Sequence, residues 1–311
     1  MRALIVGAVE STRVTIRAIA DAPDWQPIGL ITLPSTLSHR HSDFVDLTDT
    51  ANAAGIDGIC HAPVNSDEAS RYVRERAPDY IFVIGSSQLC GQAFLDLAPD
   101  RVVGYHPAPL PRLRGRGVIP WTILLEEPIT AGTLFLIDAG TDSGPIIEQR
   151  FFHVHPDETA ASLYTRHIAV LEQMLNRVLA ALAHGSIVPQ RQDERLATYA
   201  ARRRPEDGEI DWSESAATVW RTIRANGAPY PGARTTINGE LLVIDAGEPV
   251  GLDHHVAAFP GQIVARGERD FVVCCGDRRG VRVTGWRSGD AAATALPPMH
   301  ARLGPSARRA A

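Results

Sequence analysis

The sequence contains no lysine, and all 31 basic residues among its 311 are arginine. This absence excludes a Schiff-base lysine and a P-loop lysine as sources of chemistry. The four cysteines show no paired spacing of the zinc or disulfide type, which favours a reducing compartment. No apolar stretch approaches the about 20 residues of a membrane span, and the first apolar run is too short for the core of a signal peptide. We therefore expect a cytoplasmic protein with no membrane segment.

The overall composition is that of an ordinary globular protein. Hydrophobic residues make up 44% of the chain and charged residues 22%, and the length allows two domains. The net charge of −5 argues against nucleic acid as a bulk partner, although a local basic face could still bind tRNA.

The first part of the chain alternates strand and helix patterns. Continuous β-branched runs separated by amphipathic segments predict a parallel sheet with helices on both faces. Ligands of such sheets bind beyond the carboxyl ends of the strands. We predict strands over 2–9, 27–33, 80–84, 132–138 and 146–155, and helices over 12–22, 43–54 and 158–183.

The later part of the chain has a different pattern. A polar, arginine-rich stretch predicts a linker, and short strands separated by turns between residues 234 and 287 predict a small barrel. The last residues are rich in Ala, Pro and Arg without periodicity, which predicts disorder. We assign a catalytic domain to 1–189, a linker to 190–208, a β-barrel domain to 209–290 and a disordered tail to 291–311.

His106 is the first candidate for chemistry. It begins a loop that holds three prolines and three arginines and ends at Arg116. The prolines fix backbone angles, and rigid placement is what a catalytic base requires. The arginines would supply fixed positive charge near an anionic ligand. Taken alone, a loop histidine is more often a solvent-facing or structural residue than a catalytic one.

A second candidate is the acidic loop over residues 138–144. Asp138 and Asp142 flank Gly140, and aspartates in such turns often bond only their own backbone. An aspartate held by a tight turn could also orient a histidine and accept a proton from an attacking amine. Imidazole and carboxylate together suit acyl transfer. His153 and His155 lack a third ligand, so we expect no metal site.

Several separate blocks resemble the folate-dependent formyltransferase superfamily, which includes methionyl-tRNA formyltransferases and amino-sugar N-formyltransferases. Residues 106–116 resemble its His-x-Ser-Leu-Leu-Pro-x-x-Arg-Gly loop, and residues 138–144 its Asp-x-Gly-x-Asp-Thr-Gly loop. Residues 197–212 resemble its interdomain linker, and blocks between 223 and 277 its C-terminal domain. The resemblance implies an α/β fold, with an N-terminal Rossmann-like formyltransferase domain built on a parallel-rich sheet and a small C-terminal OB-like β-barrel.

The resemblance also implies roles for residues of this chain. His106 and Asp142 would be the catalytic pair. The folate donor would contact the residues Gly85, Ser86, Ser87, Gln88, Leu89, Asp138 and Gly140, and the acceptor Glu10, Ser11, Arg114 and Arg116.

The chain departs from the family at Gly104. The family places an Asn two residues before its histidine, where its side chain polarises the formyl carbonyl. We expect Gly104 to tolerate Asn, and we expect Gln88 to supply the missing donor. Alternation along an extended segment turns Tyr105 away from the face that positions 104 and 106 share. His106 itself and backbone N–H groups near Gly104 are further candidates.

The expected function is transfer of a formyl group from 10-formyltetrahydrofolate to the amine of a small molecule, with a nucleotide-linked amino sugar as the favoured acceptor. Residues 33–46 lack the strongly basic insertion that the tRNA enzymes carry, which favours the small acceptor. Two alternatives stay open: a methionyl-tRNA formyltransferase, and a relative that changed or lost its chemistry with the asparagine. The oligomeric state is also open, with a homodimer as one arrangement.

Overall fold

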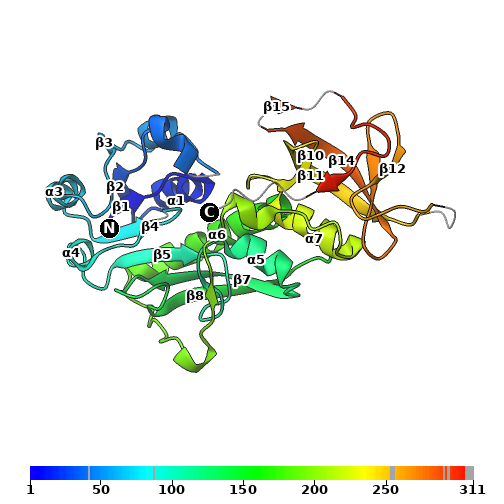
Figure 1. The fold of residues 1–311 in the computed structure, drawn as a ribbon. Helices are drawn as coiled ribbons and strands as arrows, with labels where there is room; N and C mark the ends of the chain where they lie inside the picture. The colour runs from blue at the N-terminus through cyan, green and yellow to red at the C-terminus, as the bar shows by residue number, and fades with distance from the viewer. Residues whose placement is uncertain (41–42, 87, 253–255, 290, 293–294, 305–311) are drawn as a thin grey trace. The chain divides into compact units, whose positions relative to one another are not determined.

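The computed structural model describes residues 1–311 except 41–42, 87, 253–255, 290, 293–294 and 305–311 (Figure 1). The chain forms two compact units, each with its own hydrophobic core. The first consists of Met1–Val118, Pro128–Val154 and Tyr164–Ala201, and the second of Ile119–Glu127, His155–Leu163 and Arg202–Ala311.

The first unit is built on a seven-stranded sheet in the order β3-β2-β1-β4-β5-β7-β8. Its first five strands along the chain pair in parallel, and β7 and β8 then extend the sheet in antiparallel fashion. The bounds are β1 (Arg2–Val6), β2 (Gln26–Ile31), β3 (Ile59–Cys60), β4 (Tyr80–Val83), β5 (Val102–His106), β7 (Ile129–Leu136) and β8 (Ile146–His153). The expected parallel-rich α/β fold is confirmed.

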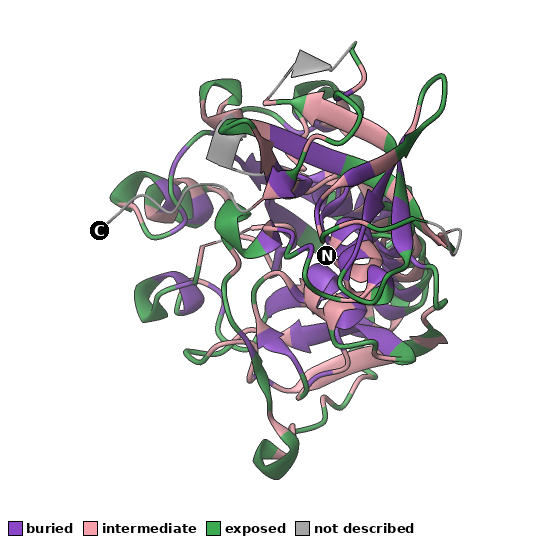
Figure 2. Cartoon of the chain, turned by 45° about the vertical axis from the view of Figure 1, so that its right-hand side comes forward, coloured by how far each residue is buried: buried purple, intermediate pink, exposed green. Residues whose placement is uncertain are grey.

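Helices cover both faces of this sheet because side chains alternate along each strand. In β1, Ala3 and Ile5 pack into a core that includes residues of α1 (Glu10–Asp21) and α6 (Ala160–Ala183). Leu4 and Val6 enter the opposite core, beside α3 (Asp67–Arg76) and α4 (Gln92–Leu95). Figure 2 colours the buried residues of strands and helices purple. The remaining helical segments up to residue 124 are η1 (Ser35–Arg40), α2 (Thr48–Ala53) and α5 (Val118–Leu124).

One helix is shorter than the sequence pattern predicts. We expected residues 43–54 to be helical, but α2 begins only at Thr48. The preceding residues pair with the β1–α1 loop instead: Phe44 forms a bridge with Val9, and the Val45 N–H donates to the Ala8 carbonyl at 2.9 Å. Tertiary pairing thus replaces the first helical turn.

The second unit contains an antiparallel sheet in the order β12-β13-β14-β11-β10-β16, with β15 paired to β14. A bridge between Gln262 and Arg302 links the two ends of this order, so the sheet curls toward a barrel. α7 packs Val219 and Ile223 into its core. The bounds are α7 (Ala216–Asn226), β10 (Ala233–Ile237), β11 (Glu240–Val250), β12 (Ile263–Arg266), β13 (Phe271–Cys274), β14 (Gly280–Ser288), β15 (Ala291–Ala292) and β16 (Leu303–Gly304). The expected small β domain is confirmed.

Two segments differ from the expected boundaries. Residues 190–201 belong to the first unit rather than to a free linker, because β9 (Tyr199–Ala200) pairs in parallel with β6 (Arg114–Gly115). The segment 291–311 was expected to be disordered, yet its described part holds β15 and β16, with Leu303 only 2% exposed. The linker also holds η2 (Glu194–Leu196) and η3 (Pro205–Gly208). Within the described chain, no helix is long and apolar enough to cross a membrane.

Candidate active site

His106 is the last residue of β5 and lies between two loops. Its side chain is almost fully buried, and its Nε2 lies 2.7 Å from the carbonyl oxygen of Leu113, to which it donates. On the other side of the ring, Nδ1 lies 3.6 Å from Oδ2 of Asp142. The structure therefore brings together the histidine and the carboxylate that the sequence singled out.

Asp142 owes its position to a strained loop between β7 and β8. Its backbone φ is +51°, in the left-handed region that few non-glycine residues adopt. Its Oδ2 also accepts a hydrogen bond from the Gly115 N–H at 2.8 Å. Gly115 has a φ of +109°, and a Cβ there would lie 2.5 Å from the Ala200 carbonyl oxygen. Only glycine fits this close approach, which points its N–H at Asp142.

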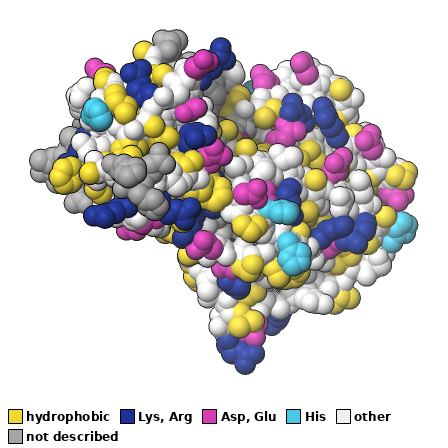
Figure 3. Space-filling model, turned by 90° about the vertical axis from the view of Figure 1, so that its right-hand side faces the viewer, with side chains coloured by type: hydrophobic (Ala, Val, Ile, Leu, Met, Phe, Trp, Pro, Cys, Tyr) yellow, Lys and Arg dark blue, Asp and Glu magenta, His cyan; other side chains and the backbone are white. Residues whose placement is uncertain are grey.

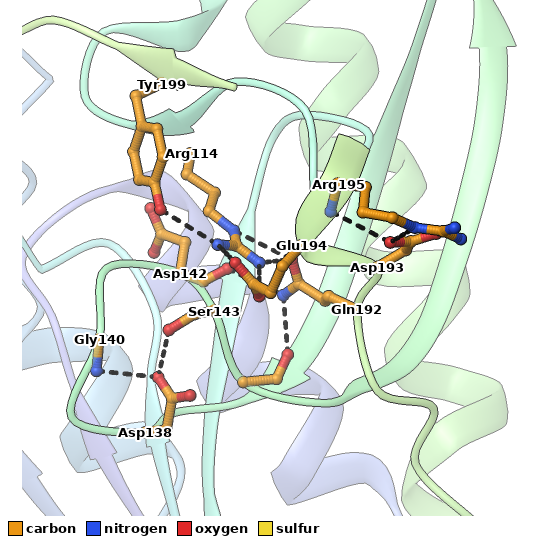
Figure 4. A network of polar contacts seen from close by, with 11 residues as sticks. Arg114, Asp138, Gly140, Asp142, Ser143, Gln192, Asp193, Glu194, Arg195 and Tyr199 are labelled. Atoms are coloured by element: carbon orange, nitrogen blue, oxygen red, sulfur yellow. Dashed lines mark hydrogen bonds and ion pairs between the residues drawn. The ribbon is translucent and has the colours of Figure 1, made fainter. Parts of the chain in front are cut away.

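Asp138 stabilises the same loop from within. Its Oδ1 accepts hydrogen bonds from the Gly140 N–H at 3.0 Å and from the Ser143 hydroxyl at 2.8 Å (Figure 4). A Cβ at Gly144 would lie 1.7 Å from the Leu136 carbonyl oxygen, so the end of the loop also requires glycine. Asp138 thus holds the turn, as turn aspartates commonly do, while Asp142 turns its carboxylate toward His106.

Arg114 lies inside this arrangement rather than on its surface. The residue is 0% exposed, and its guanidinium donates to both carboxylate oxygens of Glu194 at 2.7 and 2.9 Å. It also donates to Oε1 of Gln192 at 2.8 and 3.1 Å and to the Tyr199 hydroxyl at 3.2 Å (Figure 4). The hydrogen bonds to Glu194 raise the pKa of Arg114 and lower the pKa of Glu194. Arg114 is therefore buried among protein side chains and not placed to contact an acceptor, contrary to expectation. The Arg116 side chain, in contrast, is exposed.

A shallow, open hollow lies beyond the ends of the first parallel strands. Its described lining carries no charged side chain and consists of Val6, Gly7, Ala8, Ile31, Thr32, Leu33, Ala62, Val64, Gly85, Ser86 and Gln88. The Thr32 hydroxyl oxygen is buried and has no hydrogen-bond partner among the described residues. A neutral ligand group could satisfy that hydroxyl.

Two of the residues expected to contact the acceptor lie at the start of α1 and are not part of this lining. Glu10 pairs with Arg13 one turn further along the helix. Ser11 is 8% exposed, and its carbonyl accepts from the Thr15 hydroxyl at 2.7 Å. The backbone of Gly7 and Ala8, just before the helix, lines the hollow instead.

The loop after β4 contains most of the residues expected to bind the donor. The Oε1 of Gln88 accepts a hydrogen bond from the Val64 N–H at 2.9 Å, so its carboxamide turns toward the β3–α3 loop. Leu89 is 65% exposed, which leaves apolar surface at the loop tip. Ser87 lies outside the described residues. No hydrogen bond joins Gln88 to His106 within the described chain, so its expected role as the formyl-oxygen donor stays a prediction.

Comparison with known proteins identifies the family. Residues 47–179 match the family model described as formyl transferase, and residues 203–293 match that of the formyl transferase C-terminal domain. The methionyl-tRNA formyltransferase of Solibacter usitatus is 34% identical over 214 residues, 69% of this chain and 67% of that protein. That of an Anaeromyxobacter species is 30% identical over 272 residues, 86% of this chain and 87% of that protein.

The chain belongs to the formyltransferase family. Members of this family are folate-dependent N-formyltransferases, so the expectation of an enzyme of this kind is confirmed. The first match lies mostly in the first unit of this formyltransferase, although its residues 119–127 and 155–163 belong to the second unit, and the second match lies within the second unit.

Solved structures support the fold. The N-formyltransferase from Helicobacter canadensis, in complex with folinic acid and dTDP-3-aminofucose, has a TM-score of 0.66 at 16% identity and covers 91% of this chain and 98% of that one. HypX from Aquifex aeolicus, in complex with tetrahydrofolic acid, has a TM-score of 0.68 at 18% identity. That match covers 99% of this formyltransferase but only 46% of HypX.

A buried polar pair lies on the face of β5 opposite to His106. Tyr105 faces away from His106, and its hydroxyl lies 3.1 Å from the carbonyl oxygen and 3.3 Å from Nδ1 of His167. Burial lowers the pKa of His167 to about 3 and raises that of Tyr105. Tyr105 is therefore not available to a formyl oxygen, as strand alternation predicts.

The sequence analysis did not single out Gln192, Glu194 or Tyr199. All three lie in the segment that it treated as a linker, where polar residues usually mean solvent exposure. The only signal in the sequence is position, because Gln192 and Glu194 lie a few residues before the Ala-Thr-Tyr block that resembles the family, and this position does not reveal their contacts with Arg114. Within the described residues, no cluster of three His, Cys, Asp or Glu side chains could hold a metal ion.

Proposed function

We propose that this formyltransferase moves a formyl group from 10-formyltetrahydrofolate to the amine of a small molecule, and that the acceptor is a nucleotide-linked amino sugar. The observation that carries the proposal is the placement of His106 against Asp142, 3.6 Å apart, in a chain of the formyltransferase family. Both loops around this pair are fixed by hydrogen bonds, so the pair is preorganised for acyl transfer.

The two side chains would divide the chemistry. The acceptor nitrogen forms a bond to the formyl carbon, and the bond from that carbon to the donor nitrogen breaks as the adduct collapses. A proton leaves the acceptor amine and one is returned to the donor nitrogen. Asp142 suits the proton transfer because its Oδ1 makes no hydrogen bond within the described residues and its side chain is 22% exposed, against 6% for His106. His106 would then stabilise the charge that develops beside it.

The donor site proposed from the sequence is compatible with the two loops that would form it. Leu89 offers exposed apolar surface, which suits the face of a heteroaromatic ring. Asp138 keeps its Oδ2 free of hydrogen bonds within the described residues, so one carboxylate oxygen remains for a donor N–H.

The uncharged hollow beside Gly7 supports a small acceptor. Its uncharged lining and the unpartnered Thr32 hydroxyl suit a neutral group rather than a phosphate backbone. Residues 202–311 contain 15 arginines and 13 acidic residues. This net charge of about +2 is small for a surface that binds the phosphate backbone of a tRNA. On the face drawn in Figure 3, arginine side chains lie among acidic ones rather than in one continuous field.

Methionyl-tRNA is the second candidate acceptor, and a specific observation favours it. The relatives with the highest sequence identities given above, 34% and 30%, are both named methionyl-tRNA formyltransferases. The sugar enzyme, in contrast, is similar in fold at only 16% identity.

The acceptor can be tested directly with the purified full chain and 10-formyltetrahydrofolate. One series of reactions contains nucleotide-linked amino sugars, including dTDP-3-aminofucose, and a second contains initiator tRNA charged with methionine. Formylated product is measured by mass spectrometry, and the tRNA series is repeated at rising salt. The Asp142→Asn variant serves as the control for uncatalysed transfer.

We expect turnover with an amino sugar and a much lower kcat/KM with charged tRNA. A higher kcat/KM with tRNA, falling steeply as salt rises, would instead identify the tRNA enzyme. Absence of transfer to every amine by a folded protein would support a relative that lost its chemistry.

A further inference from the structure

Gln192 holds the backbone of the acidic loop from outside. Its Nε2 donates to two carbonyl oxygens on either side of Ser143, that of Asp142 at 2.8 Å and that of Gly144 at 2.7 Å. A carboxamide has two N–H groups, and both are used on this one turn. Gln192 therefore fixes the peptide groups that set the direction of the Asp142 side chain.

The other end of the Gln192 carboxamide is fixed in turn by Arg114. The Oε1 of Gln192 accepts from Nε of Arg114 at 3.1 Å and from Nη2 at 2.8 Å. Glu194 and Tyr199 occupy the remaining donors of the guanidinium (Figure 4). With its oxygen held in this way, the carboxamide of Gln192 cannot flip without losing four hydrogen bonds.

These contacts form a closed ring that begins and ends on Asp142. The Asp142 carboxylate accepts from the N–H of Gly115, and Gly115 follows Arg114 in the chain. The Arg114 side chain reaches Gln192, and Gln192 returns to the Asp142 carbonyl. The side chain of Asp142 is thus held by Gly115, and its backbone by Gln192, which Arg114 holds in turn.

We infer that Gln192 is a positioning residue for Asp142 in formyl transfer, acting on the rate of the chemical step through the ring of hydrogen bonds with Arg114. The inference rests on the proposed function, because it presumes that Asp142 takes part in the reaction. A misplacement of about 1 Å in a reacting group can cost on the order of 10²-fold in rate, so loss of the two loop contacts lowers kcat. Because Gln192 acts through Asp142 and not through a contact of its own with a substrate, we expect KM for donor and acceptor to stay the same.

Gln192→Glu separates the two halves of this contact. A glutamate keeps an oxygen for Arg114 but replaces the donor Nε2 with a second oxygen, which faces the carbonyls of Asp142 and Gly144 without a proton to share. The matched control is Asp193→Asn, one residue away. Asp193 pairs with exposed Arg195, which Figure 4 shows extending away from Arg114.

The first readout does not depend on activity. Hydrogen–deuterium exchange is followed in the peptides that cover residues 113–117 and 138–144 of the unaltered enzyme and both variants. We expect faster exchange in Gln192→Glu, because the Gly115 N–H loses its fixed acceptor, and no change in Asp193→Asn. Unchanged exchange in Gln192→Glu would overturn the inference.

The second readout is a double-mutant cycle on kcat. We expect Gln192→Glu to lower kcat by about 10- to 100-fold in the unaltered enzyme and by less than about 2-fold in the Asp142→Asn background. Equal losses in both backgrounds would show that Gln192 acts independently of Asp142 and would overturn the inference. Unaltered enzyme without any formyl transfer would refute the proposed function, and the exchange experiment would then decide the positioning alone.

Discussion

The ring of Phe135 occupies the space that a side chain at position 104 would enter: a Cβ atom on Gly104 would lie 2.9 Å from two carbons of that ring. The two residues are direct partners in the antiparallel pairing of β5 and β7. A third contact, 3.0 Å from Ile137, closes the space. The glycine at the family's asparagine position is therefore accompanied by a bulky aromatic residue on the neighbouring strand.

Gly104→Asn should for this reason destabilise the protein, contrary to what the sequence alone suggested. We expect a loss of about 1–3 kcal/mol in the free energy of unfolding, because the new side chain overpacks a filled core. The loss should shrink in a Phe135→Leu background, which removes the two ring carbons. Urea unfolding of the single and double variants measures both quantities. Equal losses in the two backgrounds would show that the ring moves aside freely.

His106→Ala and Asp142→Asn should each lower kcat by at least about 10²-fold with folding intact, since a positioned acid–base group contributes about that much. Steady-state rates with 10-formyltetrahydrofolate and the acceptor that the proposed assay identifies provide the measurement, and circular dichroism checks the fold. Near-normal turnover of Asp142→Asn would mean that the acidic loop is only a structural turn.

Gln88→Ala should cost more in rate than Tyr105→Phe. Gln88 lines the hollow and keeps its Nε2 without a partner among the described residues, so it can donate to a substrate. The Tyr105 hydroxyl is engaged with His167 on the other face of the sheet. The comparison uses kcat of both variants on one preparation of substrates. An unchanged rate in Gln88→Ala would leave a backbone N–H or His106 as the donor to the formyl oxygen.

The buried His167 should lower the free energy of unfolding in mild acid. Burial, the largest cause, lowers its pKa from 6.5 to about 3, and its Nε2 has no hydrogen-bond partner in the described structure. The unfolded chain then binds a proton below pH 6.5 that the folded protein binds only near pH 3. The free energy of unfolding therefore decreases as pH falls through this range, by at most about 1.4 kcal/mol per pH unit.

The matched variant for this effect is His167→Gln, which does not titrate. Urea unfolding at pH 7.5 and 5.5 should show a loss larger by about 1 kcal/mol in the unaltered protein than in the variant. The same pH dependence in both proteins would mean that His167 gains a proton in the folded state as readily as in the unfolded one.

Much of the architecture could be predicted from local patterns, and the exceptions share a physical cause. The runs of β-branched residues predicted the parallel sheet. The candidate site was predicted from the proline-rich loop after His106 and the turn around Asp142. The roles of Arg114 and Gln192 could not be predicted, because they depend on a segment about 80 residues away folding back onto the loop. Residues 43–47 were wrongly predicted to be helical for a similar reason, since Phe44 and Val45 pair with the β1–α1 loop.

The short strand β16 has a consequence for association between molecules. It pairs with Thr236 and Ile237 of β10, while Glu209 forms a bridge to Arg234 further along the same edge. The N–H and C=O groups of β10, which would otherwise form an open row, are thus covered from both ends. An open row of this kind is a template for strand addition and aggregation. The last described residues of the chain therefore protect the small sheet from edge-to-edge pairing with other copies.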